Sequence, residues 1–117
     1  MQDETTYKLL KLIEEKPHLS QRAIAKHMGI SLGKVNYCIQ SLVDRGHIKA
    51  RNFYSSKNKS AYMYYLTPFG IEEKVKVTYR FLKSKIQEFE EVKQEIERLK
   101  SETKNLEVAP EQDFTNE

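Results

Sequence analysis

The chain has 117 residues, of which 32% are charged and 38% hydrophobic, which leaves room for one small domain and an appendage. It has no run of about 18 apolar residues and no basic-then-apolar N-terminus, so neither a membrane span nor a signal peptide is predicted. The net charge of +3 is uneven, with eleven Lys and Arg against five Asp and Glu in residues 1–70, but nine against twelve in residues 71–117. A basic N-terminal part joined to an acidic C-terminal part is typical of a protein whose basic part binds a polyanion. Lysines that only keep a surface soluble would give the same excess of positive charge.

Three short helices are predicted first. Residues 5–16 (TTYKLLKLIEEK) form the first, with a threonine cap at its start and Pro17 at its end. The second follows Ser20 as N-cap and ends at Gly29, which suits a left-handed C-terminal position. The third begins after Ser31 and is closed by Gly46. Its apolar residues have the spacing of one helical stripe: Val35, Cys38, Ile39, Leu42 and Val43.

A β-hairpin with a basic tip is predicted next. Residues 47–53 (HIKARNF) and 61–67 (AYMYYLT) alternate and are rich in β-formers, with the polar segment SSKNKS between them. This loop carries Lys57 and Lys59, and we expect Phe53 and Tyr54 to pack at its base. Thr67 or Pro68 ends the hairpin and opens another helix.

The last predicted element is a long helix from Ile71 to about Leu106, without proline or glycine. Its heptad seam is interrupted by Lys85 and two threonines and is best between residues 82 and 99: Leu82, Ile86, Phe89, Val92, Ile96 and Leu99. One helix cannot bury such a seam alone, so we predict a homodimer through a coiled coil of either polarity. Folding of the helix back onto its own domain is the alternative. The tail, residues 107–117, is predicted to be disordered.

This order of elements predicts a mainly α fold with a small β wing. Residues 1–70 are expected to form a winged helix-turn-helix domain and residues 71–106 a dimerisation helix. A helix-turn-helix needs a small residue where its helices cross, here Ala25, and a turn residue of positive φ, here Gly29. The apolar residues that would hold the two helices together are in place: Ile24, Met28, Ile30, Val35 and Cys38.

Helix 31–45 is then the recognition helix that enters the major groove of double-stranded DNA. Asn36 and Gln40 are four residues apart on its outer side, and both amides can read the N6 and N7 edge of adenine. Gly33 would leave clearance for the duplex. The full set of predicted DNA-binding residues is Ser20, Gln21, Arg22, Ser31, Gly33, Lys34, Asn36, Tyr37, Gln40, Arg51, Lys57 and Lys59. Each has a plainer explanation, since the serines can be caps alone and Asn36 a solvated polar residue.

The sequence offers no candidate catalytic site, cofactor site or metal site. Cys38 lies on the apolar stripe, and the three histidines are scattered without the short spacing of zinc ligands. A single cysteine excludes an internal disulfide and is typical of the cytoplasm, where we expect the protein. Two rival interpretations stay open: a winged-helix adaptor that binds protein and not DNA, and a regulator that responds to metal or thiol chemistry.

Two segments, SLGKVNYCIQSLVDRGHIKARNF and SKNKSAYMYYLTPFGIEEKVKVTYRFLKSKIQEFEEVKQEIERL, resemble the MarR-family EPS-associated transcriptional regulators of bacteria. The resemblance covers roughly residues 7–106 and implies a cytoplasmic DNA-binding regulator of extracellular-polysaccharide genes. Two features depart from the wider MarR family. The chain starts almost directly at the first helix of the DNA-binding domain, and the wing lacks the family's Asp-x-Arg pair. We therefore do not predict a small-molecule effector, and the expected wing contacts depend on Lys57 and Lys59.

Overall fold

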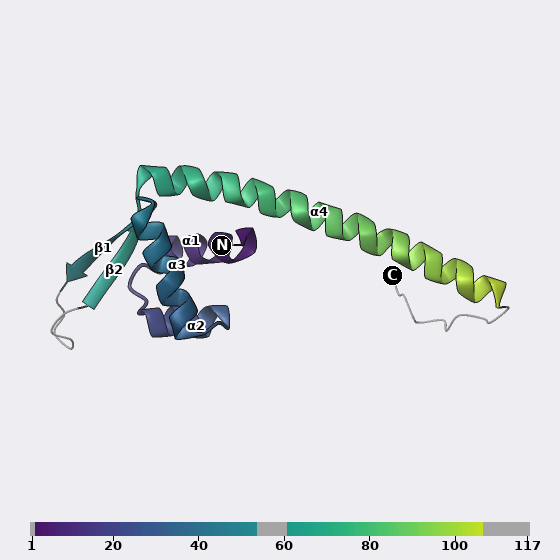
Figure 1. Ribbon diagram of the computed structural model, residues 1–117, viewed down its shortest axis with the longest axis horizontal. Helices are drawn as coiled ribbons and strands as arrows, with labels where there is room; N and C mark the ends of the chain where they lie inside the picture. Colours follow the sequence, from purple (N-terminus) through teal and green to yellow (C-terminus); the bar gives the residue numbers. More distant parts are fainter. Residues whose placement is uncertain (1, 54–60, 107–117) are drawn as a thin grey trace. The chain divides into compact units, whose positions relative to one another are not determined.

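The computed structural model describes residues 2–53 and 61–106, and these form four helices and one two-stranded sheet (Figure 1). In chain order the elements are α1 (Asp3–Glu15), α2 (Gln21–Met28), α3 (Leu32–Asp44), β1 (Ile48–Phe53), β2 (Ala61–Leu66) and α4 (Pro68–Asn105). This order confirms the predicted winged helix-turn-helix fold with a long C-terminal helix. Within the described ranges, no helix combines the length and the apolar composition that a membrane span requires.

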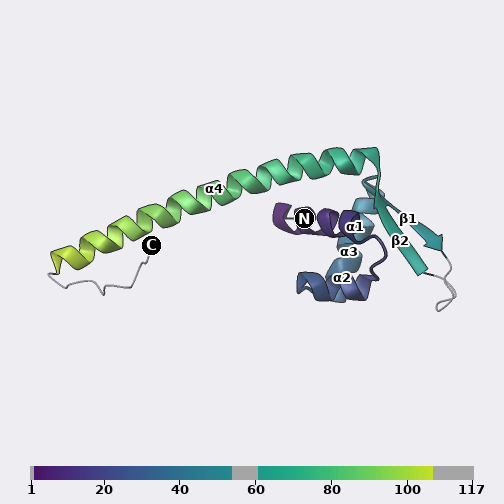
Figure 2. The same ribbon diagram turned by 180° about the vertical axis from the view of Figure 1, so that it is seen from behind.

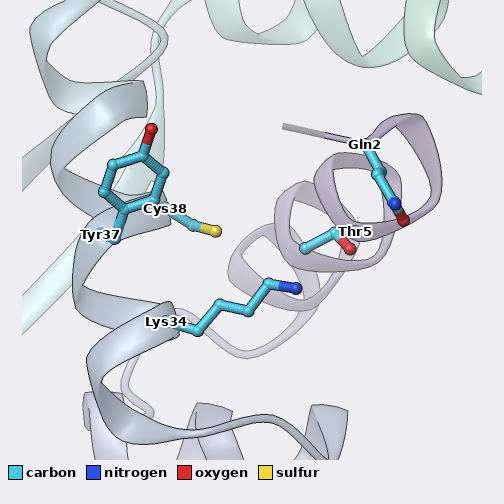
Figure 3. A pocket seen from close by; sticks show the side chains of 5 residues that line it. All are labelled: Gln2, Thr5, Lys34, Tyr37 and Cys38. Carbon is cyan, nitrogen blue, oxygen red and sulfur yellow. The ribbon is translucent and has the colours of Figure 1, made fainter.

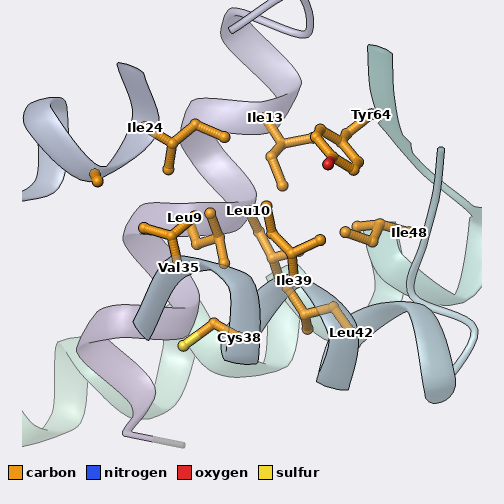
Figure 4. Close-up of a cluster of buried hydrophobic side chains, with 11 residues drawn as sticks. Leu9, Leu10, Ile13, Ile24, Val35, Cys38, Ile39, Leu42, Ile48 and Tyr64 are labelled. Carbon is orange, nitrogen blue, oxygen red and sulfur yellow. The ribbon is translucent and has the colours of Figure 1, made fainter. Parts of the chain in front are cut away.

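The helices α1, α2 and α3, seen from two sides in Figures 1 and 2, pack around one apolar core. Every element of the first 66 residues contributes to it (Figure 4). Its buried members are Leu9, Leu10, Ile13, Ile24, Ala25, Val35, Cys38, Ile39, Leu42, Ile48 and Tyr64. Met28 and Ile30, expected to join the helix pair, are partly buried against this core. Each fully buried aliphatic side chain contributes about 1.5–3 kcal/mol, so this core fixes how α2 and α3 are held.

The caps of α2 and α3 form as predicted. Ser20 Oγ accepts a hydrogen bond of 3.1 Å from the Ala23 N–H, and Ser31 Oγ accepts one of 3.1 Å from the Lys34 N–H. Gly29 has φ +68°, a left-handed conformation that an L side chain adopts only at a cost. It closes α2 and starts the turn into α3.

The predicted threonine cap of α1 is wrong. The helix begins at Asp3 with Gln2 as N-cap, and Thr5 and Thr6 lie inside it. Thr6 is buried, and its Oγ1 donates a hydrogen bond of 3.1 Å to the Gln2 carbonyl one turn earlier. Asp3 and Glu4 in the first turn complement the positive end of the helix, so α1 extends beyond the threonines.

The hairpin is an antiparallel pair whose register runs from Ile48 opposite Leu66 to Phe53 opposite Ala61. Ala50 lies opposite Tyr64, and the Tyr64 N–H donates a hydrogen bond of 3.3 Å to the Pro17 carbonyl. β2 is thereby fastened to the segment between α1 and α2. The predicted basic tip with Lys57 and Lys59, together with Tyr54, lies outside the described residues.

Thr67 caps α4, and Pro68 is its first residue, as predicted. Thr67 Oγ1 accepts a hydrogen bond of 3.1 Å from the Gly70 N–H and donates one of 2.5 Å to the Gly46 carbonyl. Gly70 is buried against the backbone of His47, where the Cβ of any other residue would lie 1.9 Å from the carbonyl oxygen. The beginning of α4 therefore sits on the turn between α3 and β1.

Two compact units divide the chain, residues 1–81 and residues 82–117. The contacts of the first unit extend beyond Gly70, the expected boundary, because the first turns of α4 pack on α1. Val77 is buried, the rings of Tyr7 and Phe81 lie 5.3 Å apart between centroids, and Arg80 Nε lies 3.1 Å from Asp3 Oδ2. The second unit contains the rest of α4.

Candidate nucleic-acid interface

Helix α3 turns one side toward the core and the other toward solvent. Val35, Cys38, Ile39 and Leu42 are buried, whereas Val43, predicted to share their stripe, is 37% exposed. Helical geometry explains this difference, since Val43 lies about 80° around the axis from Val35, at the edge of the stripe. The core therefore holds α3 by the other four residues.

The solvent side of α3 is polar along most of its length. Lys34, Asn36 and Gln40 are exposed, and the ring of Tyr37 is 69% exposed. Gly33, in the first turn, has no heavy atom within 4 Å of the position that a Cβ would take. Within the described residues, this face thus offers a cation, two amides, a phenol and a stretch of bare backbone.

A chain of hydrogen bonds joins Asn36 to the hairpin. Asn36 Nδ2 donates to Gln21 Oε1 at 3.2 Å, and Gln21 Nε2 donates to the Tyr64 hydroxyl at 3.0 Å. Gln21 is the first residue of α2, and Tyr64 lies in β2 and belongs to the core. The structure therefore brings together two predicted site residues and a third, Tyr64, that no sequence pattern singled out. Tyr64 lies within the strand predicted at residues 61–67, but the sequence gives no signal for this hydroxyl contact.

Gln40, the second predicted adenine reader, is also held by a neighbour. Its Nε2 donates a hydrogen bond of 3.0 Å to Asp44 Oδ1, one turn later in α3. One amide hydrogen and the amide oxygen of Gln40 stay available for a base edge. In the sequence, Asp44 stands out only as an isolated acidic residue in a basic stretch.

The starts of α2 and α3 carry four of the predicted DNA-binding residues: Ser20, Gln21, Arg22 and Ser31. Ser20 and Ser31 are exposed and serve as N-caps, and Arg22 is exposed in the first turn of α2. Free N–H groups and the helix dipole favour an anion at such ends. The capping hydrogen bonds form in the protein by itself, so they support the local structure whether or not a phosphate is bound.

The described part of the wing contributes one predicted residue. Arg51 in β1 is exposed, and its guanidinium carbon lies 5.3 Å from the centroid of the Tyr65 ring, a cation–π contact between the two strands. Lys57 and Lys59 lie outside the described residues, so the predicted wing contacts are represented here by Arg51 alone.

Cys38 lines an open pocket of about 370 Å³ with Gln2, Thr5, Lys34 and Tyr37 (Figure 3). Figure 3 shows its sulfur directed from α3 toward the helix that carries Thr5. The side chain is 1% exposed, and burial raises the pKa of the Cys38 thiol, while the Lys34 charge acts in the opposite direction. Since the thiolate is the reactive form, this environment favours an unreactive thiol. Among residues 2–53 and 61–106, no three His, Cys, Asp or Glu side chains gather as a metal site would require.

Comparison with known proteins gives a match over the three short helices of the domain. Residues 2–49 match the family described as winged helix-turn-helix DNA-binding. No curated protein has a sequence that matches the chain.

Several solved structures are similar to this fold. The transcriptional regulator SlyA is 21% identical, with a TM-score of 0.60 over 86% of this chain and 73% of its own. MarR is 18% identical, with a TM-score of 0.54 over 89% and 75% of the two chains. A MepR mutant from a multidrug-resistant S. aureus clinical isolate is 19% identical, with a TM-score of 0.54 over 90% and 77%. At these identities, the similarity shows a shared fold with MarR-type regulators.

Proposed function

We propose that this chain is a homodimeric, sequence-specific DNA-binding regulator of transcription. The observation that carries the proposal is the division of α3, whose apolar side is buried while Lys34, Asn36 and Gln40 face solvent. A helix held in this way within a winged helix-turn-helix domain presents its polar side to the major groove. Direct readout needs such amides and cations because each base pair displays a distinct set of donors and acceptors there.

The roles divide between base edges and phosphates. Asn36 and Gln40 would read bases, whereas Ser20, Ser31 and Arg22 at the helix starts would meet phosphates. Arg51 in the wing, and Lys57 and Lys59 beyond the described part, would add phosphate or minor-groove contacts. Tyr37, the residue after Asn36 in α3, would also face the groove. Lys34 can reach either a guanine edge or a phosphate.

The second unit supplies the argument for a homodimer. Its apolar seam is exposed in the single chain, with 62% of Phe89 and 43% of Ile96 accessible and similar values for the rest: Leu82, Ile86, Val92 and Leu99. A row of exposed apolar side chains along one helix is best buried by a second copy. Two recognition helices spaced about 34–36 Å apart would then bind half-sites one helical turn apart.

The proposed target is a set of extracellular-polysaccharide genes in a bacterium, with action in the cytoplasm. This part is supported by the resemblance of GKVNYC and LTPFGIEEK to the EPS-associated regulators. A genomic binding-site selection with the purified full chain tests it. Recovered sites upstream of polysaccharide genes would support the target, and sites elsewhere would overturn it.

DNA binding itself is tested by titrating a random duplex and a selected duplex at about 50–200 mM salt. A protein that neutralises several phosphates loses affinity steeply over this range because counterions are released. A protein-binding adaptor would instead show almost no DNA binding at low salt, which would refute the regulator. In a thiol- or metal-responsive regulator, oxidant or zinc would change the affinity for the operator, and Cys38→Ser would abolish that response.

A further inference from the structure

We propose that Gln21 and Tyr64 are positioning residues that commit Asn36 to read adenine and reject guanine. This inference rests on the proposed DNA-binding function and adds a specificity to it. It follows from the chain of hydrogen bonds that runs from the core, through α2, to the exposed amide on α3.

The inner end of this hydrogen-bond chain is packed in the core. Tyr64 is 6% exposed, its ring is packed in the core (Figure 4), and its backbone N–H is bonded to the Pro17 carbonyl. The Tyr64 hydroxyl is therefore a fixed point, from which the amide of Gln21 takes its orientation. Since Gln21 begins α2 directly after its capped N-terminus, its backbone is fixed as well.

The outer end then has a defined set of free groups. A neutral asparagine amide carries two N–H donors and one oxygen acceptor. Asn36 uses one donor on Gln21 Oε1, so one donor and the oxygen remain for DNA. Adenine presents one acceptor, N7, and one donor, the N6 amino group, which match these two groups.

Guanine presents two acceptors in the same place, N7 and O6, and both require donors. Asn36 could satisfy both only by giving up its bond to Gln21, which would leave the Gln21 oxygen without that partner. An unanchored asparagine could turn its amide either way and would discriminate less. The contact to Gln21 therefore acts as the specificity element, although Gln21 need not touch the base.

The chain of hydrogen bonds can be tested first in the absence of DNA. Tyr64→Phe removes only the hydroxyl and keeps the ring in the core, and Tyr7→Phe in α1 is the matched control. In amide NMR spectra of the full chain, Tyr64→Phe should shift the side-chain N–H signals of both Gln21 and Asn36, and Tyr7→Phe should shift neither. Unchanged Asn36 side-chain signals in Tyr64→Phe would overturn the proposal, whatever the protein binds.

The specificity is tested on the duplex recovered by binding-site selection with the wild-type chain. Adenine should be preferred over guanine by about tenfold at the Asn36 position. Tyr64→Phe should reduce this preference by about twofold to tenfold, the worth of one hydrogen bond, with affinity for random duplex unchanged. In an Asn36→Ala background, Tyr64→Phe should have no further effect on the preference.

Gln21→Glu provides a rescue, because a carboxylate still accepts from Asn36. We expect its adenine preference to be retained while overall affinity falls, whereas Gln21→Leu should lose the preference. Equal loss at every base position in Tyr64→Phe, or a guanine preference in wild type, would contradict the proposal. If the selection recovers no sequence at all, the DNA-binding function fails, while the NMR result still decides whether the hydrogen-bond chain exists.

Discussion

Gly33 is the position where folding and DNA binding should respond in opposite directions. It lies in the first turn of α3, between Leu32 and Lys34, and its φ is not in the left-handed region. Nothing lies within 4 Å of a Cβ built on it, so a side chain meets no steric obstacle in the free protein. Gly33→Leu should therefore fold normally.

The expected magnitudes follow from this open space. Replacing a helical glycine by a better helix former raises the free energy of unfolding by up to about 1 kcal/mol, and by less in the first turn, where the hydrogen-bond ladder is incomplete. If the bare backbone of Gly33 is clearance for the duplex, a leucine there pushes α3 away from the groove. The loss of one base contact, about 1–3 kcal/mol, corresponds to at least about a fivefold weaker Kd.

The assay pairs urea unfolding with duplex binding on the same preparations. Gly70→Ala is the contrasting variant, because its Cβ would lie 1.9 Å from the His47 carbonyl oxygen, and it should destabilise the fold by about 1–3 kcal/mol or more. A Gly33→Leu protein that is strongly destabilised yet binds DNA with normal affinity would refute the clearance argument.

Three further predictions concern the thiol, the wing and the rod. Because burial raises the pKa of the Cys38 thiol above its ordinary value of 9.0, the folded chain resists losing that proton. The stability that the protonated thiol contributes to the folded state is therefore fully present below about pH 9.0, and it is lost as the pH rises through the raised pKa. Cys38→Ala should flatten this alkaline loss in urea titrations, and iodoacetamide should alkylate the native thiol at least about tenfold more slowly than the unfolded one. Arg51→Ala should make the fall of log K for DNA binding with log salt concentration less steep, by about one in the slope, and Lys76→Ala in α4 should leave the slope unchanged. Equal slopes in the two variants would contradict a phosphate contact of the wing. Phe89→Glu should convert a dimer to a monomer in sedimentation, whereas Gln94→Glu, which adds the same charge off the seam, should not; a monomeric wild type would refute the dimer.

Local signals in the sequence were enough to predict the elements and much of the exposed face. The caps at Ser20 and Ser31 and the left-handed Gly29 depend on neighbours within three or four residues, and those neighbours are visible in the chain. The buried stripe of α3 depends on helical period, which is equally local. The exposed positions of Lys34, Asn36 and Gln40 follow from that stripe by elimination.

Contacts between distant residues were decided only by the tertiary structure. Thr5 and Thr6 have the pattern of cap residues in the sequence, but Thr6 is buried inside α1. Asp3, in the first turn of α1, pairs with Arg80, which lies 77 residues later in the sequence. Tyr64 reaches Gln21 across 43 residues, because β2 lies against the segment that precedes α2. Periodicity predicts which face a residue occupies, whereas the partner of its polar atoms depends on how the elements pack. The amides on α3 were therefore predictable, and the orientation of Asn36 was not.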